Sequence, residues 1–322
     1  MNRSHPYPLT AGVVLLVLAL PALGADITIL NADDPDVGFN DETTVEPVGD
    51  NPETTLGEQR LFAVEFAADI WRALLESRVE IVVRTRWSDE LECNSDSATL
   101  GTAGPITVHA GFPDAPVADT WFPAALADSL AGSDLSDSDP EIRMNLNVKL
   151  DDGASDCLGG ATWYYGVDGN VPSDQVDIVP LVLHELGHGL GFTTFVDLTS
   201  GALLPPEEGA EGLPDIYMRH IRDTETGLDW LDMDDAQRAE SAINDPDVVW
   251  TGAAVDAMAS SFVTEPDAFS DGFLRLHTPD PLESGSSIAH WTSDASPALL
   301  MEPSLSRALF DQVDLTLDLF TD

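Results

Sequence analysis

Apolar residues at helical spacing predict one long helix in the first third of the chain. Between Leu56 and Ser77 they recur three and four residues apart over about five turns. The repeating positions are Leu61, Val64, Ala68, Trp71 and Leu75, with Phe62, Phe66 and Ile70 beside them. Such a pattern gives a helix one broad apolar face, so the segment is predicted to be well buried.

Alternating apolar and polar residues predict strands around this helix. The segment from Val79 to Trp87 places every second residue on one apolar face, and Ile27 to Leu30 form a shorter candidate. The same alternation recurs later, at Met144, Leu146, Val148 and Leu150. We expect the strand around Asn145 to Lys149 to present an open edge to an extended peptide.

A second helix is predicted where the apolar run Leu181-Val182-Leu183 leads into His184-Glu185-Leu186-Gly187-His188. Asp177 is suited to cap its first turn, which tolerates Pro180. Its buried side is expected to hold Leu181, Leu183, Leu186 and Leu190. Gly191 is predicted to end the helix, because glycine allows the left-handed turn that takes the chain away from the axis.

The spacing of His184 and His188 indicates a zinc site. Residues four apart share one face of a helix, so both imidazoles can reach one metal ion. Glu185 then lies beside the water that the metal carries, as a general base requires. The alternative is a core helix that contains two incidental histidines.

A catalytic zinc ion takes a third protein ligand from outside this helix. Glu207 and Glu208 lie at a suitable distance along the chain but follow Pro205-Pro206 in a predicted loop. Thr194 occupies the position where the short form of the motif has a third histidine, and threonine is no zinc ligand. The remaining histidine candidates are His220, His277 and His290, of which His290 stands in Gly285-Ser286-Ser287-Ile288-Ala289-His290-Trp291.

Met301 follows His290 by eleven residues, in Leu300-Met301-Glu302-Pro303, and with it this part of the chain resembles the leishmanolysin family of metzincin peptidases. The resemblance covers about residues 178–193 and 285–304. It implies that His290 is the third zinc ligand, with His184 and His188, and that Met301 forms a methionine turn beneath the metal. It also implies a long insertion after the Gly191 turn. His277 and His220 remain alternatives for the third ligand.

The resemblance also implies the architecture of an α+β metzincin. The expected parts are a mixed twisted sheet, a long backing helix, the active-site helix and a C-terminal subdomain with the methionine turn. The chain departs from the family in having two cysteines and no tyrosine after Met301. We therefore expect neither latency through a propeptide cysteine nor a tyrosine that steadies the transition state.

The predicted organisation has four parts. Residues 1–24 read as a secretory signal peptide, because Arg3 precedes a short apolar stretch and Ala22-Leu23-Gly24 resembles a cleavage site. An acidic extended segment, 25–55, precedes an N-terminal catalytic subdomain, 56–192. The C-terminal subdomain, 193–322, contains helical patterns near Pro214 to Arg222 and Asp234 to Ile243.

The apolar stretch of the signal peptide is too short to cross a bilayer, although a membrane anchor is the alternative. Export outside the cell, or to a periplasm, is the expected localisation. In that compartment Cys93 and Cys157 are expected to form one disulfide. The alternatives to the disulfide are a free thiol and a thiolate that binds the zinc ion.

The chain is strongly acidic, with 58 acidic and 13 basic residues and a formal charge of -45. Nucleic acid and anionic membranes would be repelled by such a surface. Calcium is conceivable near Asp33-Asp34-Pro35-Asp36, but no spacing there matches an EF-hand loop. The expected partners are protein or peptide substrates, and no feature of the sequence defines an oligomeric state.

These features together predict a secreted zinc-dependent endopeptidase in which Glu185 is the general base. Two other classes compete with it. One is an exported zinc-binding surface or adhesion protein without catalysis. The other is a zinc hydrolase that acts on a non-peptide amide.

The charge yields a first prediction. Acidic residues that repel one another destabilise the folded chain. Salt weakens this repulsion, because the distance over which charges act falls from about 10 Å at 0.1 M to about 3 Å at 1 M. The thermal unfolding midpoint is therefore expected to rise with NaCl concentration over this range. A midpoint that stays constant or falls in a calorimetric titration would contradict the screening argument.

Overall fold

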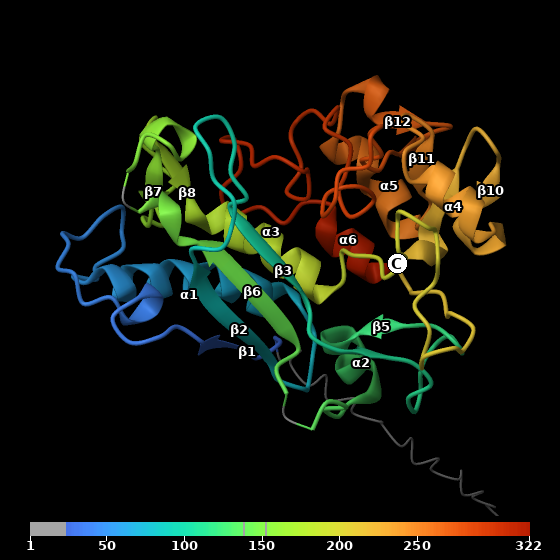
Figure 1. Ribbon diagram of the computed structural model, residues 1–322, viewed down its shortest axis with the longest axis horizontal. Helices are drawn as coiled ribbons and strands as arrows, with labels where there is room; N and C mark the ends of the chain where they lie inside the picture. The colour runs from blue at the N-terminus through green and yellow to red at the C-terminus, as the bar shows by residue number, and fades with distance from the viewer. Residues whose placement is uncertain (1–23, 138, 152) are drawn as a thin grey trace, which may run out of the picture.

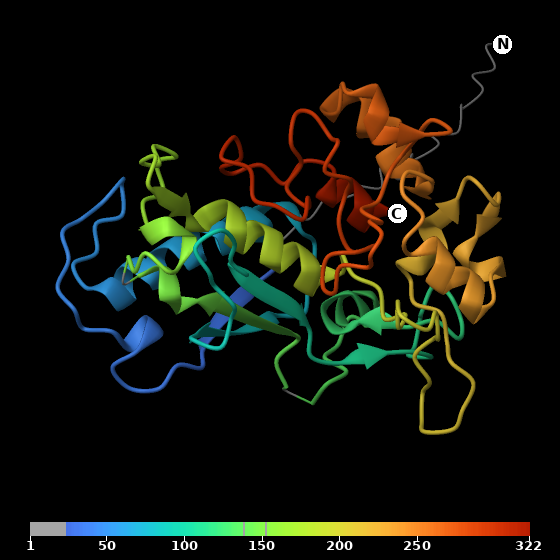
Figure 2. The same cartoon turned by 45° about the horizontal axis from the view of Figure 1, so that its top comes forward.

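The computed structural model describes residues 24–137, 139–151 and 153–322. Of the predicted signal peptide, residues 1–24, only Gly24 lies within these ranges, where its backbone pairs with Glu76. The chain forms a mixed α+β fold with open sheets (Figures 1 and 2).

The main sheet has four strands in the order β1-β2-β6-β3. Their bounds are Ile27–Asn31 for β1, Ile81–Ser88 for β2, Ile142–Asn147 for β6 and Gly101–Pro105 for β3. β1, β2 and β6 run parallel, whereas β3 pairs antiparallel to β6, with Gly101 opposite Leu146. The sheet is therefore mixed, and the predicted strands at 27–30 and 79–87 are confirmed.

The predicted strand near Asn145 is only partly confirmed. β6 ends at Asn147, and Val148–Leu150 form a 3-10 turn in which the Asn147 side chain accepts a hydrogen bond from Lys149 N. The expectation that this strand forms the sheet edge is wrong, because β6 is hydrogen-bonded on both sides. The edge strand is β3, which the alternation of apolar residues did not reveal.

Two long helices pack against each other and against the sheet: α1, Leu56–Leu74, and α3, Ile178–Leu190. The Thr55 side chain caps α1, which ends three residues before the predicted Ser77. The indole of Trp71, buried on α1, donates a hydrogen bond to the Leu183 carbonyl on α3. The backing helix and the helix with the paired histidines thus form one layer (Figure 1).

Short elements connect these parts. In the N-terminal half they are the 3-10 turns Gly38–Asn40 and Leu158–Gly160, α2 Ala124–Ala131, β4 Val108–His109, β5 Phe122–Pro123, β7 Thr162–Tyr164 and β8 Gln175–Asp177. In the C-terminal half they are β9 Ile221–Asp223, β10 Leu228–Asp229, β11 Val248–Trp250, β12 Phe269–Ser270, β13 Phe273–Leu274, α4 Asp235–Ser241, α5 Ala253–Phe262 and α6 Thr316–Thr321, with 3-10 turns at Met218–His220, Trp230–Asp232 and Pro266–Ala268.

The two helical patterns predicted in this half have different outcomes. The one near Asp234 is confirmed as α4, with a capping box between Asp234 and Gln237. The helix at Pro214–Arg222 is wrong, because only the 3-10 turn Met218–His220 forms before β9. The buried carboxylate of Asp215 accepts hydrogen bonds from the amides of Phe195 and Met218, which holds this segment in an irregular loop.

The larger of two hydrophobic clusters extends through both halves of the described chain, from Ala25 to Leu319. Four fully buried indoles anchor it, those of Trp71, Trp230, Trp250 and Trp291. The Trp291 ring packs edge-on against Phe192, which follows the Gly191 turn at the end of α3. Packing therefore joins the C-terminal segment to the end of the α3 helix.

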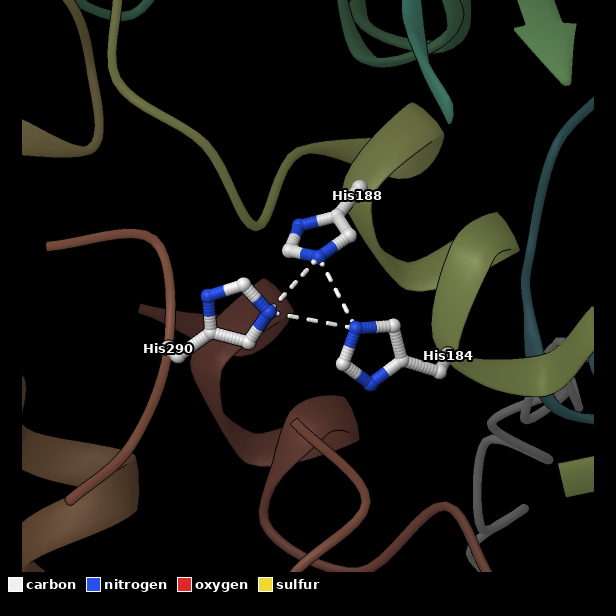
Figure 3. Close-up of side chains that lie close together, drawn as sticks. All are labelled: His184, His188 and His290. Carbon is white, nitrogen blue, oxygen red and sulfur yellow. Dashed lines mark hydrogen bonds between the residues drawn. The ribbon is translucent and has the colours of Figure 1, made fainter. Parts of the chain in front are cut away.

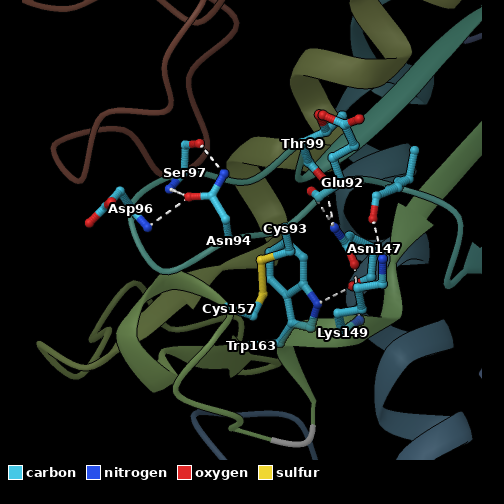
Figure 4. Close-up of a disulfide and its surroundings, with 11 residues drawn as sticks. Glu92, Cys93, Asn94, Asp96, Ser97, Thr99, Asn147, Lys149, Cys157 and Trp163 are labelled. Atoms are coloured by element: carbon cyan, nitrogen blue, oxygen red, sulfur yellow. Dashed lines mark hydrogen bonds between the residues drawn. A yellow bond between two sulfur atoms is a disulfide. The ribbon is translucent and has the colours of Figure 1, made fainter.

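Cys93 and Cys157 lie at disulfide distance, as expected, and neither is a free thiol (Figure 4). The loop that starts at Cys93 leads into β3. It is also fixed by the Asn147 side chain, which donates a hydrogen bond to the Thr99 carbonyl, and by the Lys149 ammonium group, which donates one to Leu91. The covalent link and these hydrogen bonds set where the edge strand begins.

Among the helices in the described ranges, none has the length and apolar character needed to cross a lipid bilayer.

Candidate metal centre

Local sequence signals define the helix that carries the paired histidines. The Asp177 side chain accepts a hydrogen bond from Val179 N at 3.1 Å, so the predicted cap is confirmed. The helix ends at Leu190, and Gly191 follows with a φ of 146°, a conformation that favours glycine. Burial is not confined to the predicted leucine side, because every residue of α3 except His184 is buried.

Three imidazoles converge at the C-terminal half of α3 (Figure 3). His184 Nε2 lies 3.0 Å from His188 Nε2, and His290 Nε2 lies 3.2 Å from each of them. His184 and His188 come from successive turns of the helix, whereas His290 comes from a loop 102 residues beyond His188. These three residues form a group that could bind a metal ion.

Hydrogen bonds to backbone carbonyls fix the tautomer of all three rings. The Nδ1 atoms of His184, His188 and His290 lie 2.7, 2.8 and 2.8 Å from carbonyl oxygens. These carbonyls belong to Leu300, Phe192 and Ser286, respectively. A carbonyl oxygen can only accept, so each Nδ1 carries the proton and each Nε2 directs a lone pair to the centre.

Burial keeps the three rings neutral. Desolvation lowers the pKa of His184 to about 4 and that of His188 to about 3. The pKa of His290 is lowered well below its usual range, first by burial and then by the neighbouring histidines. At neutral pH the rings are therefore unprotonated at Nε2, the state in which imidazole binds a metal.

The donor set fits a zinc ion. Three lone pairs that face one another without a shared proton repel, and a cation between them removes this repulsion. In a tetrahedral zinc site with bonds of about 2.0–2.1 Å, neighbouring ligand atoms are about 3.3 Å apart, close to the separations of the three Nε2 atoms. Neutral imidazole is a common ligand for zinc and for other divalent transition metals.

The other candidate ligands lie elsewhere. His109 contacts the Ser136 hydroxyl, His220 stacks on the Trp250 ring, and His277 contacts the Glu283 carboxylate. Glu207 and Glu208 are exposed in a loop. Of the described histidines, only His290 joins the helical pair, whereas His5 lies outside the described residues.

The Glu185 carboxylate lies between the histidines and the edge strand. Glu185 is only 4% exposed, and the backbone amide of Ala103 on β3 favours its ionised form. Burial raises the pKa of Glu185 to about 8. Its Oε2 atom has no hydrogen-bond partner among the described residues. A divalent cation held by the histidines would favour the ionised carboxylate and lower this pKa.

Met301 packs against Gly187 of the α3 helix. Its sulfur would lie 2.7 Å from a Cβ atom added at Gly187, and Ile142 approaches Gly189 in the same way. Close packing by Met301 and Ile142 therefore explains why glycine occupies these two helical positions. The loop is held by Asp314, whose carboxylate accepts a hydrogen bond from Leu300 N at 2.5 Å.

Two supporting carboxylates could not be recognised from the sequence. Asp314 fixes Leu300, whose carbonyl accepts the Nδ1 proton of His184. Asp215 accepts a hydrogen bond from the Thr194 hydroxyl at 2.7 Å, which gives Thr194 a structural contact in place of a metal. Both carboxylates bind residues that are distant in the sequence, and no motif with a fixed spacing indicates these pairs.

A cleft of about 1000 Å³ gives access to the histidines and Glu185. β3 lines this cleft at Gly101 to Ala103, and residues 284–287, 289–290, 302–307 and 309 line it as well. The edge strand and the three imidazoles therefore border the same open space.

The structure gives no support for calcium binding at Asp33-Asp34-Pro35-Asp36. The Asp33 carboxylate accepts hydrogen bonds from the Phe39 and Trp87 amides, so it organises the chain around itself. A separate group of carboxylates, Asp128, Asp134 and Glu141, has oxygen atoms within 4.8 Å of one another. Asp128 and Glu141 are buried and accept hydrogen bonds from the Leu135 and Val82 amides, respectively.

Comparisons with protein-family models, with curated proteins and with solved structures found no match. The resemblance to leishmanolysins accordingly rests on residues 178–193 and 285–304 alone. The geometry of His184, His188 and His290 stands independently of it.

The packing under the helix yields a prediction. A leucine at Gly187 would overlap the Met301 sulfur, and overpacking of this kind costs about 1–3 kcal/mol. We expect Gly187→Leu to lower both the free energy of unfolding in urea and the zinc content after dialysis. The additional change Met301→Ala, which makes room, should restore part of both. Unchanged zinc content in Gly187→Leu would show that this contact does not support the site.

Proposed function

We propose that this protein is an exported zinc-dependent endopeptidase of the metzincin type, similar to leishmanolysins. The convergence of three neutral imidazoles beside a buried carboxylate, in an open cleft, carries the proposal. Three nitrogen ligands leave a coordination position for water, which is typical of catalytic zinc sites.

Each residue of the centre has a role in peptide hydrolysis. A bound zinc ion would lower the pKa of its water ligand to about 7 and polarise the carbonyl group of the scissile bond. Glu185 would accept a proton from the attacking water and return it to the leaving amine. The carbonyl partners of the three Nδ1 atoms would keep the imidazoles oriented while the charge at the centre changes.

The edge strand supports a peptide as the substrate. Asn147 N donates to Leu100 O and Ile106 N donates to Glu141 O, which places these groups on the β6 side. Because alternate residues of a strand direct their backbone groups to opposite sides, those of Gly101 and Ala103 face away from β6. An extended substrate could pair with this free edge, the role first expected for the strand around Asn145.

The two competing functions fit the site less well. A structural zinc site is usually closed by four protein ligands, and it has no use for a buried carboxylate with an unpaired oxygen. A hydrolase for a small amide needs no cleft of about 1000 Å³ with a strand edge along it. Export is proposed from the apolar N-terminal stretch, and the Cys93–Cys157 pair fits an oxidising compartment.

Casein cleavage by the zinc-loaded protein tests the proposal. We expect cleavage that a chelator abolishes and added zinc restores. Glu185→Gln should lower kcat by about 10²–10⁴-fold, because the general base is lost, while zinc content stays the same.

Glu207→Gln, in an exposed loop, is the matched control and should cleave like the wild type. Intact casein with zinc-loaded wild-type protein would contradict the peptidase assignment. Equal activity of the wild type and Glu185→Gln would contradict the role of Glu185.

A further inference from the structure

The edge strand β3 approaches the Glu185 side chain most closely at Gly101. A Cβ atom added at Gly101 would lie 2.7 Å from Glu185 Oε1 and 3.0 Å from both Cδ and Cγ. Real Cβ atoms essentially never come within 3.0 Å of another heavy atom. Glu185 can therefore occupy its position only because residue 101 has no side chain.

The same strand also influences the carboxylate two residues later. The Ala103 amide favours the ionised form of Glu185, and residues 101 and 103 direct their backbone groups away from β6. One side of the carboxylate thus faces β3 at Gly101, whereas Oε2 has no partner in the described part of the chain. The strand therefore limits where this carboxylate can lie.

A side chain at residue 101 would displace the carboxylate rather than the helix. Met301 and Ile142 pack tightly against Gly187 and Gly189, so α3 has little freedom to shift. The nearest atom to the added Cβ is a terminal oxygen of Glu185, which side-chain rotation can move. The imidazoles of His184 and His188 project from the same helix and would keep their places.

We propose that Gly101 is a positioning residue for the general base, and that the edge strand holds Glu185 in its catalytic orientation. This inference rests on the proposed peptidase function. A displacement of about 1 Å at a catalytic group can cost about 100-fold in rate. The effect should appear in kcat, because substrate binding along the strand does not require the carboxylate.

Gly104 offers a matched control on the same strand. No heavy atom among the described residues lies within 4 Å of a Cβ atom added there. Gly104→Ala therefore makes the same chemical change in β3 without touching Glu185. Any general effect of alanine on this strand should appear equally in both variants.

The kinetic test compares Gly101→Ala with Gly104→Ala on a fluorogenic peptide that contains a casein cleavage site. We expect kcat to fall about 10–100-fold in Gly101→Ala, with KM and zinc content unchanged, and to stay at the wild-type value in Gly104→Ala. A change confined to KM would assign Gly101 to substrate binding and overturn the proposal. Equal kcat values in the two variants would also overturn it.

A double-mutant cycle separates this role from a general structural one. Glu185→Asp shortens the side chain and relieves the overlap with a Cβ atom at residue 101. If Gly101 acts through Glu185, adding Gly101→Ala to Glu185→Asp should lower kcat much less than it does in the wild type. Additive losses would contradict the proposal.

Crystal structures of the metal-free variants give a readout without activity. The Glu185 carboxylate should be displaced in Gly101→Ala and unmoved in Gly104→Ala. An unmoved carboxylate in Gly101→Ala would refute the inference even if the wild type cleaves casein. If the wild type does not cleave casein, the peptidase proposal fails, while these structures still decide whether Gly101 positions Glu185.

Discussion

The centre depends on three backbone carbonyls that bind the outer nitrogens of three histidines. Because Leu300, Phe192 and Ser286 accept the Nδ1 protons, the Nε2 lone pairs all point to one place, where they lie 3.0–3.2 Å apart. Burial prevents the rings from gaining protons that would ease their mutual repulsion. The three nitrogens are thus arranged as a group that could bind a metal ion.

Close packing fixes the positions of these carbonyl groups relative to the α3 helix. Phe192 follows the Gly191 turn directly, whereas Leu300 and Ser286 belong to the C-terminal segment. The contact of Met301 with Gly187 and the hydrogen bond from Leu300 to Asp314 fix that segment under α3. On the opposite side, β3 approaches Glu185 through Gly101. Glycines at three positions therefore let the helix, the sheet and the loop meet around one small volume.

The sequence predicted the features that short-range patterns encode. Helical spacing, the Asp177 cap and the Gly191 stop predicted α3, and alternation predicted β2. The four-residue spacing placed His184 and His188 together. His290 lies 102 residues beyond His188, so only the leishmanolysin resemblance indicated it.

Features that depend on distant packing were missed or wrong. The strand order, which makes β3 rather than β6 the edge, follows from pairing between segments about 40 residues apart and has no local signal. The helix predicted at Pro214–Arg222 is replaced by a loop around the buried Asp215 carboxylate. Burial of α3 extends beyond the predicted side to every residue except His184, because the C-terminal segment also packs against the helix through Met301.

X-ray absorption spectroscopy of the zinc-loaded protein tests the central claim most directly. The account predicts one zinc ion per chain, bound by three imidazole nitrogens and one oxygen at about 2.0–2.1 Å. In His290→Ala the spectrum should lose one imidazole or the zinc ion altogether. A site with four protein ligands, or a spectrum that is the same in His290→Ala as in the wild type, would contradict the account.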